Sequence, residues 1–302
     1  MSRIPILNIL CGAPGSGKST YAKTLESQGY FVLSSDKIRK VFYGDENNQE
    51  HNNSVFEILY RVAVDRINDG DSVVIDATNI GVKARKKALG HFKDCKCIKV
   101  CTVICTPPLS IKINDANRKR SVGSEVIDKY LKSFEIPTRE EGFDYIEFYY
   151  PQWGGCILAN IEEDMYDFAL YYEQNNPHHS HTIGIHCILA SNEYLLDSSV
   201  KNKDIADALL YHDIGKLYTT TRDAKGISHY YGHGNYGAYV CMCSEQFKLG
   251  KLSPESVFYI NHHMEPYFWK ERNKDFEKFK NLYGEEKLNN LMIVHKYDEE
   301  AH

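Results

Sequence analysis

A glycine-rich run near the start of the chain carries the clearest chemical signal. It extends from Gly12 to Thr20, between an apolar stretch and a segment with a helical pattern. Glycines let backbone N–H groups turn toward a phosphate, and a following helix N-terminus adds partial positive charge. Lys18 can then reach the β- and γ-phosphates while the hydroxyl of Ser19 holds Mg²⁺. We therefore expect ATP or another nucleoside triphosphate, with Mg²⁺, bound by Gly12, Gly15, Ser16, Gly17, Lys18, Ser19 and Thr20.

Polar residues follow the next two apolar stretches. Asp36 could accept a proton from an attacking hydroxyl, and Arg39, one helical turn on, could clamp a phosphate. The alternative for Asp36 is a helix cap. Asp76 could orient Mg²⁺ through water, and Thr78 and Asn79 could position the substrate, or these residues could simply make local turn hydrogen bonds.

Two basic clusters lie further along. The run 117–120, which ends at Arg120, precedes a helical segment over 124–134 and could form a mobile lid that neutralises a transferred phosphoryl group. A second cluster could hold a nucleic-acid backbone. It comprises Lys83, Arg85, Lys86 and Lys87. For both basic clusters a solvated face is the commoner explanation.

Histidines concentrate in the second half, where 11 of the 13 lie at or beyond position 178. His212 and Asp213 follow an apolar helical stripe, and Gly215 indicates the helix end. Such a pair is costly to bury unless it is hydrogen-bonded or bound to metal. Imidazole and carboxylate ligands converging from separate helices suit Mn²⁺, Fe²⁺, Co²⁺, Ni²⁺ or Zn²⁺. The further candidate ligands are His186, His233, His262, His263 and Asp298.

These residues must be positioned by two different architectures. The first half alternates apolar strands, at 5–11, 30–34, 72–75 and 97–105, with helical stretches. This alternation predicts a parallel sheet with helices on both faces. Helical periodicity dominates the rest, over 162–173, 182–196, 204–217, 237–248, 253–262 and 285–300. We expect an α/β domain over 1–150, a linker over 151–163 and an all-helical domain over 164–302.

Bulk properties support this division and bound the function. The chain has 302 residues and a net charge of −5, but residues 1–150 carry +3 and the remainder −8. Nine cysteines without zinc or redox spacing favour a reducing, cytoplasmic setting. Neither a signal peptide nor a membrane-spanning stretch is expected.

The first-half motifs together resemble the polynucleotide 5′-kinase branch of the P-loop kinases, over about 4–148. The resemblance rests on GxxGSGKST, D-x-x-R, I-D-A-T-N and a lid ending in F-x-x-P-x-x-x-E-G-F-D. It implies that Asp36 is the general base, that Arg39 holds the phosphate beside the acceptor hydroxyl, and that Arg120 contacts the donor phosphates. The chain departs from the family's R-N-x-x-R lid pattern, because Ala116 stands at the first arginine.

The second half resembles the HD-domain metal-dependent phosphohydrolases over about 164–302. The matching pieces are N-P-H-H-S-H-T-I-G-I-H, L-L-Y-H-D-I-G-K, Y-Y-G-H-G-N-Y-G-A, N-H-H-M and H-K-Y-D-E-E-A-H. The resemblance implies that Lys216 holds a substrate phosphate and that two metals act on phosphate esters. The implied core ligands are His186, His212, Asp213 and Asp298, with His233 and His262 or His263 holding a second metal.

Together, the resemblances imply an end-healing enzyme for RNA or DNA. It would phosphorylate 5′-OH ends and remove 2′,3′-cyclic, 3′- or 2′-phosphates, with a separate ligase as its natural partner. One alternative is a kinase for nucleosides or other small hydroxyl compounds fused to a nucleotide phosphohydrolase. Another is a nucleotide-sensing binding module in which hydrolysis is incidental.

Overall fold

The computed structural model describes residues 4–46, 50–152, 158–176, 180–197, 201–269 and 273–301. They form two compact units, one of Met1–Ile127 with Pro137–Cys156 and the other of Asp128–Ile136 with Ile157–His302. The division differs from the expected boundary, because nine residues before position 150 group with the second unit. Of the predicted linker, 153–157 lie outside the described residues, while Ile161–Glu163 form a short helix, α7.

The first unit is built on a five-stranded parallel sheet in the order β2-β3-β1-β4-β5. The strands are β1 Ile6–Cys11, β2 Phe31–Ser34, β3 Val73–Asp76, β4 Ile98–Ile104 and β5 Tyr145–Tyr149. β1 pairs with both β3 and β4, so that Ile9 lies beside Ile75 on one side and Cys101 on the other. These central strands are nearly continuously apolar because helices cover both faces of such a sheet. The sequence did not predict β5, an edge strand without an apolar run.

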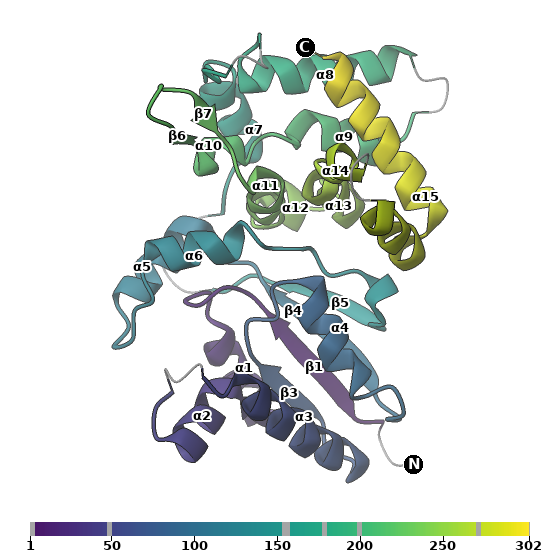
Figure 1. Ribbon diagram of the computed structural model, residues 1–302. Coiled ribbons are helices and arrows are strands. Elements are labelled where there is room, and N and C mark those ends of the chain that lie inside the picture. The colour runs from purple at the N-terminus through teal and green to yellow at the C-terminus, as the bar shows by residue number, and fades with distance from the viewer. Residues whose placement is uncertain are drawn as a thin grey trace. The chain divides into compact units, whose positions relative to one another are not determined.

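Helices flank this sheet, as Figure 1 shows for α1, α3 and α4. The helices in this part of the chain are α1 Lys18–Ser27, α2 Ser35–Tyr43, α3 Asn52–Asn68, α4 Val82–Gly90, α5 Pro108–Ala116 and α6 Ser124–Leu131, whose second half belongs to the second unit, with a 3₁₀ turn, η1, at Arg139–Glu141. α1 and α3 both pack on β2 and β3. Gly44, with φ 75°, ends α2 in the left-handed conformation that favours glycine. The strand ends and helix starts therefore place the glycine-rich run, Asp36 and Asp76 at one edge of the sheet.

The second unit is mostly helical. Its helices are α7, α8 Ile183–Asp197, α9 Lys203–Tyr211, α10 Lys216–Thr219, α11 His233–Met242, α12 Glu245–Lys248, α13 Pro254–His262, α14 Glu265–Trp269 and α15 Asn273–Glu300, with a π-helical segment, η2, at Asp164–Ala169. An antiparallel hairpin, β6 Thr221–Arg222 with β7 Ser228–His229, corrects the all-helical expectation. Two expected helices, 204–217 and 237–248, are each divided by a turn. None of the described helices is long and apolar enough to cross a bilayer.

Residues 128–136 join the second unit through buried polar contacts. The carbonyl oxygen of Phe134 accepts hydrogen bonds from Asn235 Nδ2 at 2.7 Å and from Asn261 Nδ2 at 3.0 Å. The N–H group of Ile136 donates to Asn261 Oδ1 at 2.7 Å. The ring of Phe134 meets Tyr239 edge-on. The amide of Asn261 thus replaces the backbone partners that this extended segment would otherwise lack.

Candidate functional site

The glycine-rich run forms a loop between β1 and α1. Gly15 and Gly17 have φ values of 84° and 95°, which a side chain would strain. A Cβ at Gly12 would lie 2.7 Å from Ser16 Oγ, so the backbone must be bare there. The ammonium group of Lys18 donates to the carbonyl oxygen of Gly12 at 2.8 Å. Burial lowers the pKa of Lys18 from 10.5 because it disfavours the charged ammonium, and an anionic phosphate beside the amine would stabilise that charge.

Two hydroxyl groups of this loop fit a nucleotide with Mg²⁺. Ser16 Oγ is buried and has no hydrogen-bond partner among the described residues, which fits an acceptor oxygen arriving with a phosphate. Ser19 Oγ donates to Asp76 Oδ2 at 2.8 Å, across the start of α1 and the end of β3. A hydroxyl beside a carboxylate supplies oxygen ligands of the kind that Mg²⁺ prefers. Thr20 is exposed at the beginning of α1.

Asp36 lies at the start of α2 between two arginines. Arg39 Nη1 contacts Asp36 Oδ1 at 2.7 Å, and Arg120 Nη1 contacts Asp36 Oδ2 at 3.2 Å. Arg39 is itself buried and donates from Nη2 to Asn52 Oδ1 at 2.6 Å, which fixes its guanidinium plane. The Asp36 side chain stays 46% exposed and remains accessible to an acceptor. The structure therefore brings Asp36 and Arg39, both expected at the acceptor end, together with Arg120, which was expected at the donor phosphates.

Thr78 and Asn79 are placed differently from the expectation. Asn79 is only 4% exposed and donates from Nδ2 to the carbonyl oxygen of Leu10 at 2.9 Å. Its φ of 43° is one of two positive values outside glycine among the described residues. The carbonyl oxygen of Thr78 accepts from the N–H group of Gly12 at 3.0 Å. Asn79 therefore braces β1 and does not present its amide to a substrate, which corrects its predicted role, while Thr78 supports the loop through its main chain.

The predicted nucleic-acid cluster contains a buried ion pair. Arg85 donates to Glu141 through Nε and Nη2, both at 2.8 Å, and both side chains have 0% exposure. Arg85 Nη1 also donates to the carbonyl oxygens of Asn79 and Ile80 at 3.1 and 3.0 Å. The pair holds η1 against the segment that braces the loop. Only the lysines of that cluster are exposed, so Arg85 cannot contact a nucleic-acid backbone.

An aspartate that the sequence analysis missed anchors the predicted lid. Asp115 is buried at the end of α5 and accepts from Ser121 Oγ at 2.7 Å and from the N–H groups of Val122 and Gly123 at 2.9 and 3.0 Å. Arg118 lies 3.4 Å from the same carboxylate. Although burial raises the pKa of Asp115, these donors hold it below 3.8. An aspartate six positions before the run Ser121-Val122-Gly123, at the end of an expected helical stretch, was the only local signal.

In the second unit, four histidines turn their Nε2 atoms toward one another. Each Nδ1 lies within hydrogen-bond distance of a main-chain carbonyl oxygen: His186 of Ala301 at 3.1 Å, and His212 of Leu209, His233 of Tyr230 and His263 of Ile260 at 2.8 Å. Because the carbonyl groups can only accept, each ring carries its proton on Nδ1. The Nε2 atoms, which face one another across the site, are therefore the ring atoms that a metal could take as ligands.

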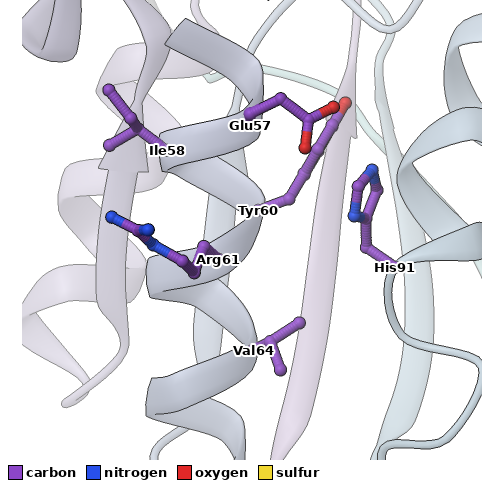
Figure 2. A pocket seen from close by; sticks show the side chains of 6 residues that line it. All are labelled: Glu57, Ile58, Tyr60, Arg61, Val64 and His91. Atoms are coloured by element: carbon purple, nitrogen blue, oxygen red, sulfur yellow. The ribbon is translucent and has the colours of Figure 1, made fainter. Parts of the chain in front are cut away.

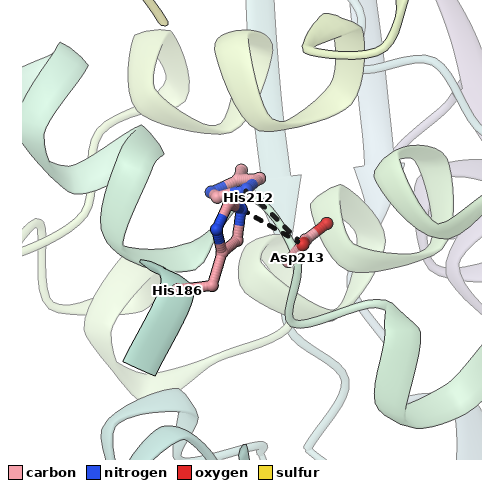
Figure 3. Close-up of side chains that lie close together, drawn as sticks. All are labelled: His186, His212 and Asp213. Carbon is pink, nitrogen blue, oxygen red and sulfur yellow. Dashed lines mark hydrogen bonds and ion pairs between the residues drawn. The ribbon is translucent and has the colours of Figure 1, made fainter. Parts of the chain in front are cut away.

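Asp213 links these histidines into two groups of metal-binding type, of which Figure 3 shows the one with His186 and His212. Its Oδ2 lies 3.5 Å from His212 Nε2 and 3.8 Å from His186 Nε2. Its Oδ1 lies 3.1 Å from His233 Nε2 and 3.8 Å from His263 Nε2. One carboxylate thus faces each pair of imidazoles with a different oxygen. We refer to these five residues as the Asp213-centred group; its imidazoles and carboxylate are ligands of the kind that transition metals take.

Asp298, on α15, and Lys216, on α10, complete the site. Asp298 Oδ1 lies 3.0 Å from His186 Nε2 and 3.2 Å from His212 Nε2. Lys216 Nζ lies 2.6 Å from Asp213 Oδ2. Burial alone would raise the pKa of Asp213, but Lys216 and His212 hold it well below 3.8. Burial, with its histidine neighbours, lowers the pKa of His263 to about 3. The carboxylates are therefore ionised and His263 is neutral. Burial alone would lower the pKa of His212, but Cys187, Asp213 and Asp298 raise it well above 6.5, so a metal would displace a proton from this ring.

His262 does not join this site. Its ring packs against Phe258, Phe279 and Tyr283, with centroid distances of 4.6, 5.5 and 5.4 Å. Between the two adjacent histidines proposed for the second metal, the structure places only His263 in the group. Successive residues at a helix end point in directions about 100° apart, so both cannot face one site. His262 is corrected to a residue of the aromatic core.

Close backbone contact holds the His212–Lys216 turn in place. A Cβ at Gly215 would lie 2.0 Å from the carbonyl oxygen of His233, and one at Gly237 would lie 3.0 Å from the backbone nitrogen of Gly215. The two glycines therefore let the turn pack directly on α11. This contact sets the spacing between Asp213 and His233, two members of the Asp213-centred group.

A surface pocket lies along α3 in the first unit (Figure 2). Tyr60 stacks on His91 at one side of it, with ring centroids 4.6 Å apart. Burial raises the pKa of Tyr60 to about 12. No predicted site residue lines the pocket, whose walls are Glu57, Ile58, Tyr60, Arg61, Val64 and His91.

Comparison with known proteins concerns mainly the first unit. A family model described as an AAA domain matches residues 7–137, and no curated protein matches the chain. A chain of the Pnkp1/Rnl/Hen1 RNA repair complex is 22% identical, with a TM-score of 0.39. The match covers 43% of this chain and 44% of the repair-complex chain, so less than half of that relative is matched. A putative kinase from Chloroflexus aurantiacus J-10-fl is 17% identical with a TM-score of 0.43, covering 52% of this chain and 91% of that one. The Mycobacterium tuberculosis APS kinase CysC is also 17% identical, with a TM-score of 0.37 and coverage of 50% and 90%. The family match, the glycine-rich loop between β1 and α1 and the five-stranded parallel sheet support a P-loop nucleotide-binding domain.

Proposed function

We propose that the chain is a bifunctional enzyme that repairs nucleic-acid ends, with one activity in each unit. The observation that carries the proposal is the Asp213-centred group, because a carboxylate facing two histidine pairs suits phosphate-ester hydrolysis. The same chain carries a phosphate-binding loop with an accessible carboxylate, Asp36, at the same sheet edge. One unit would therefore add a phosphate and the other would remove one.

In the first unit, the phosphoryl group would pass from ATP or another nucleoside triphosphate to a 5′-hydroxyl. Lys18 and the loop N–H groups bind the β- and γ-phosphates, and Ser19 with Asp76 holds Mg²⁺. Asp36 accepts the hydroxyl proton as the oxygen bonds to the γ-phosphorus and the nucleoside diphosphate leaves. Arg39, fixed by Asn52, would hold a phosphate beside the acceptor hydroxyl. Arg120 would leave Asp36 and neutralise the donor phosphates.

In the second unit, the Asp213-centred group with Asp298 would hold one or two transition metals, such as Mn²⁺, Fe²⁺, Co²⁺, Ni²⁺ or Zn²⁺. When bound, these ions activate water and stabilise a departing oxygen. Lys216 lies between Asp213 and Gln174, whose Oε1 is 2.9 Å from the ammonium group. A substrate phosphate oxygen would take the place of one of these acceptors. The expected substrates are ends with a 2′,3′-cyclic, 3′- or 2′-phosphate.

The two activities have a joint purpose. Cleavage that leaves a 5′-hydroxyl and a 2′,3′-cyclic phosphate produces ends that a ligase cannot join. A kinase and a phosphate-ester hydrolase on one chain would convert both ends to the joinable forms. RNA ends, DNA ends or both would be substrates, and a separate ligase would follow.

End-group analysis tests this proposal. A short RNA with a 5′-hydroxyl and a 2′,3′-cyclic phosphate is incubated with ATP, Mg²⁺ and Mn²⁺. We expect Lys18→Ala to lose 5′ phosphorylation alone and Asp213→Ala to lose 3′ processing alone. Lys23→Ala and Glu193→Ala, exposed residues of matching charge, serve as controls.

Three outcomes would overturn the proposal. If neither RNA end changes while free nucleosides are phosphorylated and nucleotides hydrolysed, the chain acts on small molecules. If nucleotide binds but no acceptor is phosphorylated, and Asp36→Ala changes nothing, the first unit is a sensor. If Lys18→Ala abolishes both reactions, the two-site assignment is wrong.

A further inference from the structure

Tyr231 is an exposed aromatic residue two positions before His233 of the Asp213-centred group. Its exposed fraction is 73%, which is high for a residue with so large an apolar surface. The ring of Tyr231 lies parallel to that of His229, with an interplanar angle of 4° and centroids 5.7 Å apart. Because this separation exceeds face-to-face contact, the two rings are offset and present a wide, flat aromatic surface.

This aromatic surface is rigidly mounted. His229 belongs to β7, and its Nε2 lies 3.4 Å from Asp223 Oδ2 on the same hairpin. Tyr230, which lies between these two residues in the sequence, is buried and donates its hydroxyl proton to the carbonyl oxygen of Gln174. Gly232, with φ 75°, then turns the chain into α11. Since each flanking residue is fixed, the orientation of Tyr231 costs little entropy when a planar ligand stacks on it.

The position of Tyr231 in the chain also keeps it close to the proposed metal ligands. It stands two residues before His233, so their Cα atoms lie within about 7 Å of each other. His233 Nε2 is 3.1 Å from Asp213 Oδ1, and Gln174, which holds Tyr230, also contacts Lys216 at 2.9 Å. Figure 1 shows the β6–β7 hairpin beside α10, the helix that begins with Lys216. Gln174 therefore supports both the aromatic surface, through Tyr230, and the amine of Lys216 that is proposed to bind phosphate.

The charge around this surface admits a polyanion, although the chain beyond residue 150 carries a charge of −8. Arg222, on β6, and Lys225, in the hairpin turn, are both exposed. The carboxylate of Asp223 accepts hydrogen bonds at Oδ1 from the N–H groups of Ile227 at 3.0 Å and Lys225 at 2.8 Å. The hairpin can therefore approach a phosphate backbone with its two cations.

We propose that Tyr231 and His229 form a stacking platform for the terminal nucleobase of a single-stranded end whose phosphate enters the Asp213-centred group. This inference rests on the proposed hydrolase function and deepens it, because it identifies what recognises the nucleoside. Stacking on an aromatic ring tolerates all four bases, as a repair enzyme for arbitrary ends requires. It also makes a nucleic-acid end a better substrate than a phosphate ester without a base.

A fluorescence measurement tests the platform without hydrolysis. A short RNA carries 2-aminopurine as its 3′-terminal base, with a 3′-phosphate, and is titrated with the full chain in EDTA. We expect quenching by the wild type and by Tyr231→Trp, and its loss in Tyr231→Ala. Tyr171→Ala, which removes a tyrosine 79% exposed elsewhere in the unit, should quench like the wild type. Internal 2-aminopurine should respond little in every variant.

Kinetics with added Mn²⁺ give the second readout. Tyr231→Ala should raise KM for the base-bearing end about five- to hundredfold, with kcat nearly unchanged. An end whose last nucleotide lacks its base should be processed equally by Tyr231→Ala and the wild type. The wild type should therefore prefer the base-bearing end by a similar factor.

The outcomes separate this inference from the proposed function. Equal quenching by wild type and Tyr231→Ala, with normal removal of terminal phosphates, would overturn the platform and leave the hydrolase intact. Quenching lost in Tyr231→Ala, with no hydrolysis of any end by the wild type, would support base binding but overturn the hydrolase. Self-association of the wild type that Tyr231→Ala abolishes, without quenching, would show that the surface binds a second copy and would overturn the inference.

Discussion

The Arg85–Glu141 pair should dominate the stability of the first unit. Glu141→Gln leaves the guanidinium buried at 0% exposure opposite a neutral amide. Removing one partner of such a pair costs about 3–5 kcal/mol, because the other charge stays desolvated. Glu141 Oε1 also accepts from the N–H group of Thr138 at 3.0 Å, which closes the capping box of η1. We therefore expect a loss in unfolding free energy near the upper end of that range.

The double variant Arg85→Met/Glu141→Leu should cost less than the sum of its single variants. It removes both charges and fills a similar volume, which is often nearly neutral. Two carbonyl groups, of Asn79 and Ile80, would still lose their donor, at about 1–3 kcal/mol each. A coupling energy of several kcal/mol between the two positions follows.

Urea denaturation followed by circular dichroism would measure these losses, and hydrogen exchange of peptides from β1 and β3 would assign them to the first unit. Lys83→Met, an exposed neighbour of the pair, should change stability by no more than about 0.5 kcal/mol. A loss below about 1 kcal/mol for Glu141→Gln, or additive single and double variants, would refute the reasoning.

Three further changes have defined consequences. Gly215→Ala should destabilise the second unit by about 3 kcal/mol and weaken Mn²⁺ binding measured by calorimetry, because its Cβ would meet the carbonyl oxygen of His233 at 2.0 Å; unchanged affinity would contradict this. Asn261→Ala should cost about 2–4 kcal/mol in urea denaturation and release hydrogen-exchange protection over 128–136, since the buried N–H group of Ile136 loses its acceptor; retained protection would be inconsistent with that role. Asp115 has a pKa below 3.8, so its carboxylate should be ionised and should anchor the lid fully above pH 3.8. As the pH falls through the folded pKa, the carboxylate takes up a proton and the lid should lose this anchor. NMR signals of the amides that donate to Asp115 should then titrate below pH 3.8, and a higher midpoint would disprove the assignment.

Matched controls accompany these three changes. Gly90→Ala adds a methyl group where nothing lies within 4 Å, so it should not destabilise the chain. Asn192→Ala removes an exposed amide from α8. Asp94→Asn removes a carboxylate that is 87% exposed and should leave the lid amides unchanged.

The sequence predicted those strands whose bounds are set by residues next to them in the chain. The four strands β1 to β4 lie within one residue of their expected bounds at each end, because their apolar runs are bounded by turn residues. β5 escaped detection because Tyr145 and Glu147 are exposed on an edge strand. The turn between α9 and α10 was also missed, since apolar periodicity continues through Ile214 while the backbone bends.

Side-chain direction was harder to predict than residue type. Arg85 reads as one cation of a surface cluster, and only its distant partner Glu141, 56 positions away, shows that it is buried. Asn79 follows a strand end like a substrate-binding residue, yet its left-handed backbone turns the amide into the sheet. His262 and His263 are chemically equivalent in sequence, and the aromatic core around Phe258 decides between them. Each miss depended on a contact between segments far apart in the chain.

The hold of Asn261 on Phe134 and Ile136 has a consequence for how this chain can be divided. Since residues 128–136 belong to the second unit, the polypeptide passes from one unit to the other three times. A fragment ending at residue 150 would carry Leu131, Phe134 and Ile136, all fully or almost fully buried in the whole chain, without the surface that covers them. Neither half of the chain is therefore complete on its own. A gene rearrangement that exchanged the second unit would need to transfer residues 128–136 together with residues 157–302.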